Sequence, residues 1–148
     1  MDARTYILLF VMLLCGCRDH ITEVVVLSPK EIWQSHGLRN YSMEQTRFCF
    51  CVEGGTRMVV TVLNDTVFSV VRARDSVTLF EPSARYYLSI DSLFGLIANT
   101  QADSMVVTYD GKFGYPTMID IDPQLNPVDG GVKYVTNNLK PIAAKAVR

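Results

Sequence analysis

The sequence predicts an α+β protein: an antiparallel sheet built from two meanders, with two helices packed on one face. Helix-start signals occur twice, at residues 28–31 and 89–92, and short apolar segments of alternating or β-branched residues follow each of them. Turn signals such as Gly54-Gly55 and Asp110-Gly111 separate these segments. Because short turns join neighbouring strands in an antiparallel sense, the order helix, meander, helix, meander favours this architecture.

Both helices are predicted from their capping residues and apolar stripes. The first runs from Ser28 to about His36, because Ser28 and Glu31 form a capping box and Gly37 is placed to end the helix. The second begins after Ser89, which can cap it. The apolar stripe of this second helix consists of Ile90, Leu93, Phe94 and Ile97.

The clearest hairpin pairs residues 56–63 with residues 66–74 around Asn64-Asp65, a two-residue turn. This turn places Leu63 opposite Thr66 and thereby sets the register. The expected core face then carries Met58, Val60, Val62, Val67, Val71 and Ala73. A slip of one residue would bring the arginines of the hairpin inward, so we expect the register to be well specified.

The second half of the chain predicts a loop followed by three strands. Residues 75–87 are interrupted by Pro82 and are expected to form a long loop. The strands are expected at 104–109, 117–122 and 132–136. Tyr115, between a glycine and a proline, is expected to be a core residue rather than an exposed contact residue. The single domain is thus predicted at residues 28–140, followed by a frayed tail at 141–148.

The N-terminal segment has the layout of an export signal. Residues 7–14 are continuously apolar, which suits the hydrophobic region of a signal peptide and is far short of the roughly 20 residues of a membrane-spanning helix. The run ends in Leu14-Cys15-Gly16-Cys17, which resembles the lipobox of bacterial lipoproteins. The resemblance implies a signal peptide at 1–16, lipidation of Cys17 and a tether at 17–27. The alternatives are an ordinary signal peptide or a short buried strand.

A lipobox implies a place in the cell. Two or three acyl chains, such as palmitate, on Cys17 would hold the protein stably on a lipid bilayer, because each buried methylene contributes about 0.8 kcal/mol. We therefore expect a bacterial cell-envelope protein. In a cell with two membranes, Arg18 after the lipidated cysteine favours the outer membrane facing the periplasm over the inner membrane.

Composition excludes several classes of function. The chain has 148 residues, 49% hydrophobic and 20% charged, which is the balance of a globular domain with a core. A net charge of −1 gives no basic face for nucleic acid, so no nucleic-acid partner is expected. No nucleophile elbow or phosphate-binding loop is present, and two histidines make a catalytic triad improbable. We expect no enzyme activity, no cofactor and no metal.

Cys49 and Cys51 carry the most reactive chemistry of the mature chain. They lie at the end of a predicted strand at 41–51, on one face, with Cα atoms about 6.5–7 Å apart. That separation is at or beyond the upper limit for a disulfide, so a bond would require a local kink. A structural disulfide, two packed thiols, and a redox or soft-metal site remain open. A metal site would need further ligands, for which the sequence offers His20 and His36.

Several short motifs, in this order and spacing, resemble domain-of-unknown-function family 6174 of small bacterial envelope proteins. The motifs are Trp33, Asn40-Tyr41, Cys49-Phe50-Cys51, Ile90-Asp91, Leu93-Phe94, Tyr109-Asp110, Gly114-Tyr115-Pro116 and Ile119-Asp120-Ile121-Asp122. The family implies no activity and no catalytic residues. The expected function is a non-catalytic binding or structural module that contacts an envelope protein or peptide. The alternative is a thiol redox or soft-metal-binding protein that uses Cys49 and Cys51.

Overall fold

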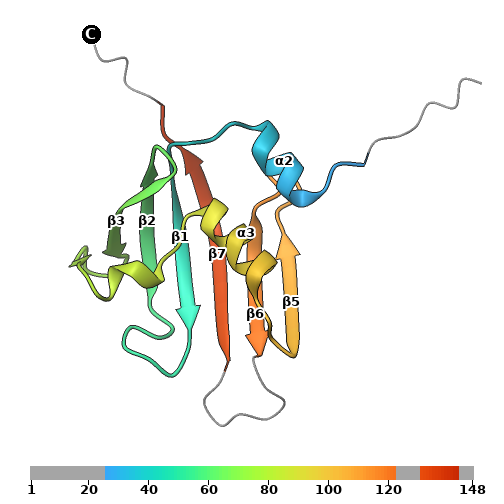
Figure 1. Ribbon diagram of the computed structural model, residues 1–148. Helices are drawn as coiled ribbons and strands as arrows, with labels where there is room; N and C mark the ends of the chain where they lie inside the picture. Colours follow the sequence, from blue (N-terminus) through green and yellow to red (C-terminus); the bar gives the residue numbers. More distant parts are fainter. Residues whose placement is uncertain (1–25, 123–130, 144–148) are drawn as a thin grey trace, which may run out of the picture.

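The computed structural model describes residues 26–122 and 131–143, and within them one sheet with two α-helices in front of it (Figure 1). The helices are α2 (Pro29–Ser35) and α3 (Ile90–Asn99), and a short 3-10 helix, η2 (Ala84–Tyr86), precedes α3. The strands are β1 (Tyr41–Phe48), β2 (Arg57–Leu63), β3 (Thr66–Arg72), β4 (Thr78–Leu79), β5 (Ser104–Tyr109), β6 (Pro116–Asp122) and β7 (Val132–Pro141). The expected signal peptide at 1–16 and the expected acylation site Cys17 lie outside the described residues. In the described part of the chain, no helix is long and apolar enough to cross a membrane.

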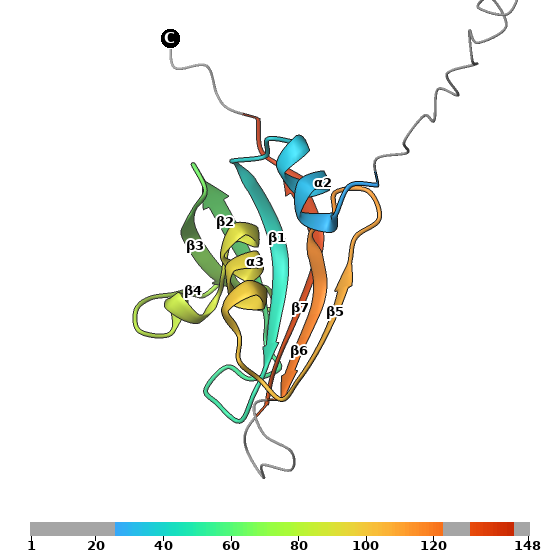
Figure 2. The same ribbon diagram turned by 45° about the vertical axis from the view of Figure 1, so that its right-hand side comes forward.

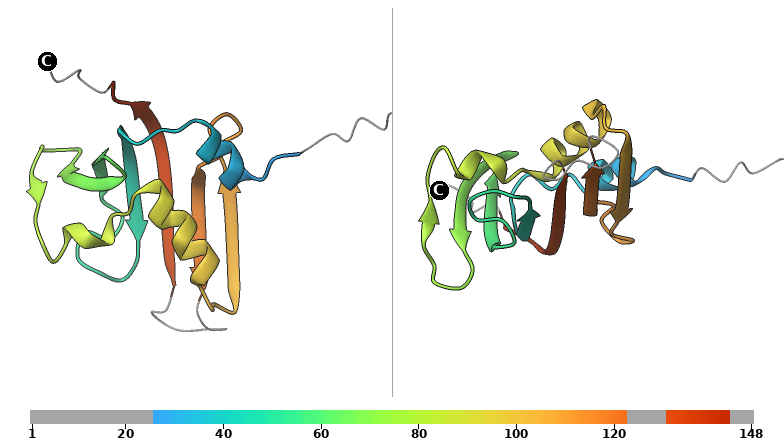
Figure 3. Two further views of the ribbon diagram at one scale, coloured as in Figure 1. Left: turned by 45° about the horizontal axis from the view of Figure 1, so that its top comes forward. Right: turned by 90° about the horizontal axis from the view of Figure 1, so that it is seen from below.

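The predicted α+β class with an antiparallel sheet is confirmed. The strand order is β4-β3-β2-β1-β7-β6-β5, and every neighbouring pair is antiparallel. Figure 2 shows β1 and β7, which are far apart in the sequence, side by side in the middle of the sheet. Figure 3 shows α3 crossing the sheet in front of β7 and β6.

Helix α2 forms as its capping residues predict. The Ser28 side chain accepts a hydrogen bond from the Glu31 backbone, and the Glu31 carboxylate accepts one from the Ser28 backbone. The loop before β6 packs directly on this helix at Gly114, whose φ of 75° suits glycine. A Cβ atom there would lie 2.3 Å from the carbonyl oxygen of Pro29, so a larger residue would separate loop and helix. Tyr115 beside it is buried, as expected.

One buried tyrosine joins the two helices to the middle of the sheet. Tyr41, at the start of β1, is 0% exposed, and its phenol oxygen accepts a hydrogen bond from the backbone N–H of Ile90 at 2.8 Å. Its ring packs against the Trp33 ring in a T-shaped arrangement, with 5.4 Å between centroids. The Trp33 indole N–H in turn donates to the Asp91 carboxylate at 3.2 Å. Tyr41 therefore supplies a partner for one of the otherwise unpaired N–H groups at the start of α3.

The predicted hairpin is confirmed at its turn and is wrong in part along its second strand. Leu63 pairs with Thr66 as expected, but the register shifts between Thr61 and Val62, which leaves Phe68 as an extra residue in β3. Beyond this bulge Val60 lies opposite Val70, so Val70 is buried in the core. Val71, which was predicted on the core face, points to the other side.

The remaining differences concern the lengths of segments. The expected loop at 75–87 contains β4 and η2, because Val70 and Val71 pair with Leu79 and Thr78. Strand β1 ends at Phe48 rather than at residue 51. Strand β7 runs to Pro141 rather than to residue 136, because it pairs with β1 along the whole length of that strand. Local patterns do not encode such long-range pairing.

The Tyr41→Phe substitution tests the link between β1 and α3. It removes the phenol oxygen and leaves the N–H of Ile90 buried without an acceptor. We expect the free energy of unfolding to fall by about 1–3 kcal/mol in chemical denaturation. Tyr109→Phe is the matched control, because Tyr109 is 38% exposed, and it should change stability by less than about 0.5 kcal/mol. Equal stability of the Tyr41→Phe protein and the wild type would contradict the assigned role.

Because of the bulge, we expect the same substitution to have opposite effects at two adjacent valines. Val70→Asp should bury an unpaired carboxylate, which costs several kcal/mol and is comparable to the stability of a small domain. Val71→Asp places the carboxylate on the other face and should leave a folded protein. Circular dichroism and thermal unfolding of both variants distinguish the registers. A folded Val70→Asp protein beside an unfolded Val71→Asp protein would restore the register without the bulge.

Candidate functional site

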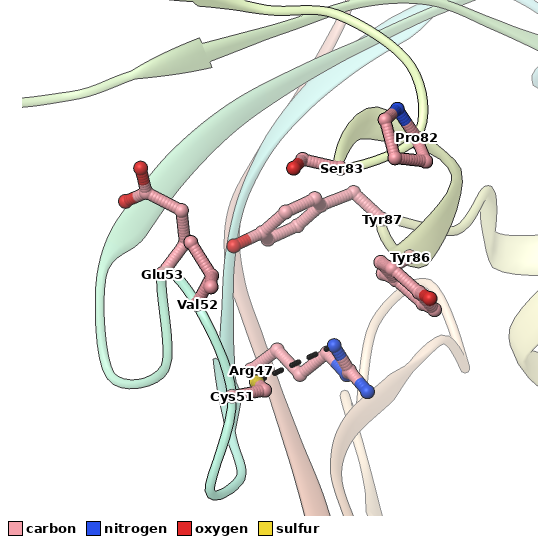
Figure 4. A pocket seen from close by; sticks show the side chains of 8 residues that line it. All are labelled: Arg47, Cys51, Val52, Glu53, Pro82, Ser83, Tyr86 and Tyr87. Atoms are coloured by element: carbon pink, nitrogen blue, oxygen red, sulfur yellow. Dashed lines mark hydrogen bonds between the residues drawn. The ribbon is translucent and has the colours of Figure 1, made fainter.

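The described residues contain a pocket of about 310 Å³ between the β1–β2 loop and the segment around η2 (Figure 4). Its lining residue Arg47 stands next to the last residue of β1, and Figure 1 shows that this end of β1 is remote from α2. Its walls are formed by Arg47, Cys51, Val52, Glu53, Pro82, Ser83, Tyr86 and Tyr87. This volume is at the lower end of the range for small-ligand pockets, roughly 300–1,000 Å³.

Arg47 supplies a positive charge to this pocket. It follows Tyr41, Met43 and Gln45 in the alternation of β1, and therefore shares their face. Its guanidinium carbon lies 4.5 Å from the centroid of the Tyr86 ring, a cation–π contact. Its Nη1 donates to the sulfur of Cys51 at 3.5 Å. Its Nε is buried and finds no hydrogen-bond acceptor among the described residues.

A second arginine contacts the same tyrosine ring. The guanidinium carbon of Arg85 lies 5.1 Å from the Tyr86 centroid, and its Nη2 donates to the Tyr86 hydroxyl at 3.1 Å. This hydrogen bond lowers the pKa of Tyr86 below its ordinary value, and the positive charges of Arg85 and Arg47 act in the same direction. Within the described ranges, neither arginine has a carboxylate within salt-bridge distance.

Glu53 lines the pocket as well, but a different arginine neutralises it. Arg72 binds the Glu53 carboxylate with Nη2, and its Nη1 lies 3.1 Å from the Asp75 carboxylate. Arg72 shares the core face because the bulge places it opposite Met58. The side chains of Arg72 and Glu53 are both less than one-fifth exposed. Arg72 therefore contacts two carboxylates, whereas Arg47 has none within salt-bridge distance among the described residues.

Tyrosine rings form the inner wall of the pocket and the core beside it. Tyr87 is buried, and burial raises its pKa above the ordinary value for tyrosine. Burial also raises the pKa of Tyr134, although Arg47 beside it acts in the opposite direction. Both phenols are therefore neutral at physiological pH, and the charges at this wall belong to arginine and glutamate.

Cys49 and Cys51 are joined by a disulfide at the rim of the pocket, with their Cα atoms 5.3 Å apart. This is shorter than the 6.5–7 Å expected for a continuous strand, because the chain leaves the strand path after Phe48. The turn behind the disulfide is tight, since a Cβ on Gly54 would lie 2.4 Å from the Cys49 carbonyl oxygen. Phe50 and Val52 on this loop are 89% and 84% exposed.

The residues considered for metal binding do not come together. Over residues 26–122 and 131–143, no group of three or more histidine, cysteine, aspartate or glutamate side chains is placed to hold a metal ion. His36 lies at the end of α2, where its Nε2 is 3.0 Å from the carbonyl oxygen of Lys112. His20 and the lipidation site Cys17 lie outside the described residues.

Sequence reasoning did not identify the two arginines or the tyrosine ring that both of them contact. Arg47 and Arg85 stand in different predicted elements, a strand and a loop, and the tertiary fold brings them together. The only local signal is the alternation of β1, which places Arg47 on the same face as Tyr41. The alternation shows on which face of the sheet Arg47 lies, but it does not show which residue Arg47 contacts.

Comparison with known proteins places the chain in a family. Residues 26–141 match the Family of unknown function (DUF6174), and the chain belongs to this family. No curated protein matches the sequence, and no solved structure matches the fold.

Proposed function

We propose that this protein is a lipid-anchored lipoprotein of the bacterial cell envelope whose domain is a non-catalytic binding module. The anchoring proposal rests on the apolar run at 7–14 and the lipobox-like sequence that ends at Cys17. The observation that carries the binding proposal is the pocket lined by Arg47, an arginine without a carboxylate within salt-bridge distance among the described residues. A positive site of this size favours a small partner group, such as one presented by an envelope protein or peptide.

The position of the pocket agrees with an anchor at the N-terminus. Figure 1 shows α2 beside the end of the sheet where β1 begins, whereas the pocket residue Arg47 stands near the other end of β1. Strand β1 separates the two ends with eight residues, or about 26 Å. A domain held at Cys17 would thus present the pocket away from the lipid surface. Arg18 favours the outer membrane, facing the periplasm, in a cell with two membranes.

We further propose that the sheet consists of two meanders joined at β1 and β7, with both helices packed on the core face. The opposite face then carries no helix among the described residues, and two ion pairs form within it. Arg57 lies 3.6 Å from Glu44, and Lys133 lies 2.6 Å from Asp120. The contrast with Arg47, which has no carboxylate within salt-bridge distance among the described residues, favours the pocket over the open face as the binding site.

The anchoring proposal predicts that Cys17→Ala removes the lipid. Radiolabelled palmitate should mark the wild-type protein and leave the variant unmarked, since the thioether forms at the Cys17 sulfur. The variant should also leave the membrane fraction or accumulate as an uncleaved precursor. Cys15→Ala is the control, because that cysteine would be removed with the signal peptide. Palmitate labelling of the Cys17→Ala protein would contradict the anchoring proposal.

A second candidate function is thiol–disulfide exchange at Cys49 and Cys51. The observation that favours it is the contact of 3.5 Å between Arg47 Nη1 and the Cys51 sulfur, because an adjacent cation stabilises a thiolate. A partner dithiol would attack the sulfur of Cys49, and Cys51 would leave as the thiolate beside Arg47. The partner's second thiolate then attacks the mixed disulfide and forms the partner's disulfide. This leaves Cys49 and Cys51 as two thiols, with the two protons supplied by the partner.

Alkylation with and without mild reductant tests this second function. An exchanging disulfide should open in about 1 mM dithiothreitol at pH 7 and label rapidly with iodoacetamide in the native state. Arg47→Gln should slow the labelling of Cys51, because its thiolate loses the nearby cation. Arg57→Gln is the matched control on the other face of the sheet. Labelling that occurs only after denaturation would exclude exchange and leave the disulfide a structural role.

A further inference from the structure

We propose that this protein forms a weak two-fold dimer, in which a groove at the β4 edge of the sheet takes up apolar side chains of a second copy. Glu81 of each copy then pairs with Arg85 of the other. Figure 2 shows β3 and β4 at this edge of the sheet. Apart from one tyrosine, the residues that line the groove differ from those of the Arg47 pocket. The inference therefore goes beyond the binding function proposed above and does not depend on it.

The first step is a hollow that the fold leaves beside an edge strand. Its volume is about 450 Å³, and its lining includes the buried side chains of Leu79 and Tyr87. Strand β4 pairs with β3 only at Val70 and Val71, so among the described residues no strand lies outside residues 66–69. A hollow of this volume has room for an aromatic side chain, since small-ligand pockets begin at roughly 300 Å³.

The second step is that two exposed aromatic side chains line the same groove. Phe68 is 72% exposed and Phe80 is 77% exposed. A single exposed apolar side chain is ordinary in a monomer, whereas aromatic residues gathered beside an apolar hollow are typical of the core of an interface. The surface thus offers both protruding rings and a hollow that can accept such rings from a second copy.

The third step is the bulge at Phe68, which decides what kind of partner fits this edge. An extended peptide that adds a strand to a sheet needs a regular row of free backbone N–H and C=O groups. Phe68 is the extra residue of the bulge and interrupts that row. Bulges of this kind prevent strand addition at the edges of sheets. We therefore expect the partner to contact side chains, as the surface of a folded protein does.

The fourth step is charge, which favours a second copy as that surface. Glu81 and Arg85 both line the groove, and both are exposed. The hydrogen bond of Arg85 to Tyr86 and, more weakly, the charge of Glu81 raise the pKa of Arg85. The two charges are therefore close, but no ion pair within salt-bridge distance joins them in the described structure.

Two-fold symmetry makes use of both charges. In a two-fold interface every contact occurs twice, so an anion and a cation on one copy meet a cation and an anion on the other. A groove with charges of one sign would repel its own copy, whereas this groove attracts it. Fourteen residues line the groove, fewer than the 20–30 on each side of a standard interface. We therefore expect weak association, with a dissociation constant on the order of 10–100 μM.

Sedimentation velocity of the full-length mature protein, in a detergent matched to the buffer density, measures this association. We expect the wild type to pass from monomer to dimer between about 1 and 500 μM. Phe68→Ser and Phe80→Ser should each raise the dissociation constant about tenfold or more, because they remove the apolar contacts. Phe50→Ser is the matched control, since Phe50 is 89% exposed but does not line the groove. Far-UV circular dichroism confirms that each variant is folded.

Exchange of charges tests the pairing of Glu81 with Arg85 between two copies. Glu81→Arg leaves two cations on each copy and Arg85→Glu leaves two anions, so each variant alone should dimerise about tenfold more weakly than the wild type. An equimolar mixture of the two variants should associate more tightly than either alone, because unlike copies restore both ion pairs. A chain that carries both substitutions should regain the wild-type dimer. Pairing within one chain would explain this recovery but not the behaviour of the mixture.

Three results would overturn the proposal. They are a protein that is still monomeric at about 500 μM, an equal loss of association in Phe50→Ser, and a mixture of the charge variants that associates no more tightly than each variant alone. None of these results depends on palmitate labelling or on the Arg47 pocket. A monomeric protein would lose this dimer and keep the function proposed above.

Discussion

The hydrogen bond from the Ile90 backbone to the buried Tyr41 phenol is the contact on which the rest of the structure depends. It provides an acceptor for a backbone N–H group in the first turn of α3, inside the core where water is absent. The helix therefore cannot shift without leaving that N–H group unpaired. The same ring packs against Trp33 and so fixes α2. Burial raises the pKa of Tyr41 far above its ordinary value, which keeps the phenol neutral at physiological pH. Tyr41, a single residue of a central strand, thereby holds both helices in position.

From Tyr41 the alternation of β1 leads directly to the pocket. Two residues before Arg47 on the same face stands Gln45, which is fully buried and whose side-chain amide pairs with both backbone groups of Leu88, at 2.9 and 3.1 Å. These two bonds hold the segment that contains η2 against β1. Tyr86 therefore reaches the guanidinium of Arg47 because Gln45 has fixed the backbone two residues further along the chain. The pocket is an extension of the core, and its rigidity comes from a buried polar residue that has no charge.

Local chemistry was sufficient to predict the parts of the fold that depend on neighbouring residues. The capping box of Ser28 and Glu31, the cap at Ser89 and the pairing of Leu63 with Thr66 all follow from short sequence signals. The bulge in the hairpin was not predictable, because a single extra residue such as Phe68 leaves the turn and the apolar composition unchanged. The site was missed for a similar reason: Arg47 and Arg85 acquire a common neighbour only when the η2 segment folds back on β1.

The bulge and the pocket are connected through charge. Because Phe68 is the extra residue, Arg72 points to the core face and binds Glu53. In the register without a bulge, Arg72 would point to the opposite face. The Glu53 carboxylate would then share the pocket with Arg47 and would have no other arginine on its wall. Internal pairing of Glu53 with Arg47 would then neutralise the positive charge that Arg47 gives to the pocket. A shift of one residue in β3 thus leaves the charge of Arg47 available, and the register of the hairpin determines the electrostatics of a site formed by other strands and loops.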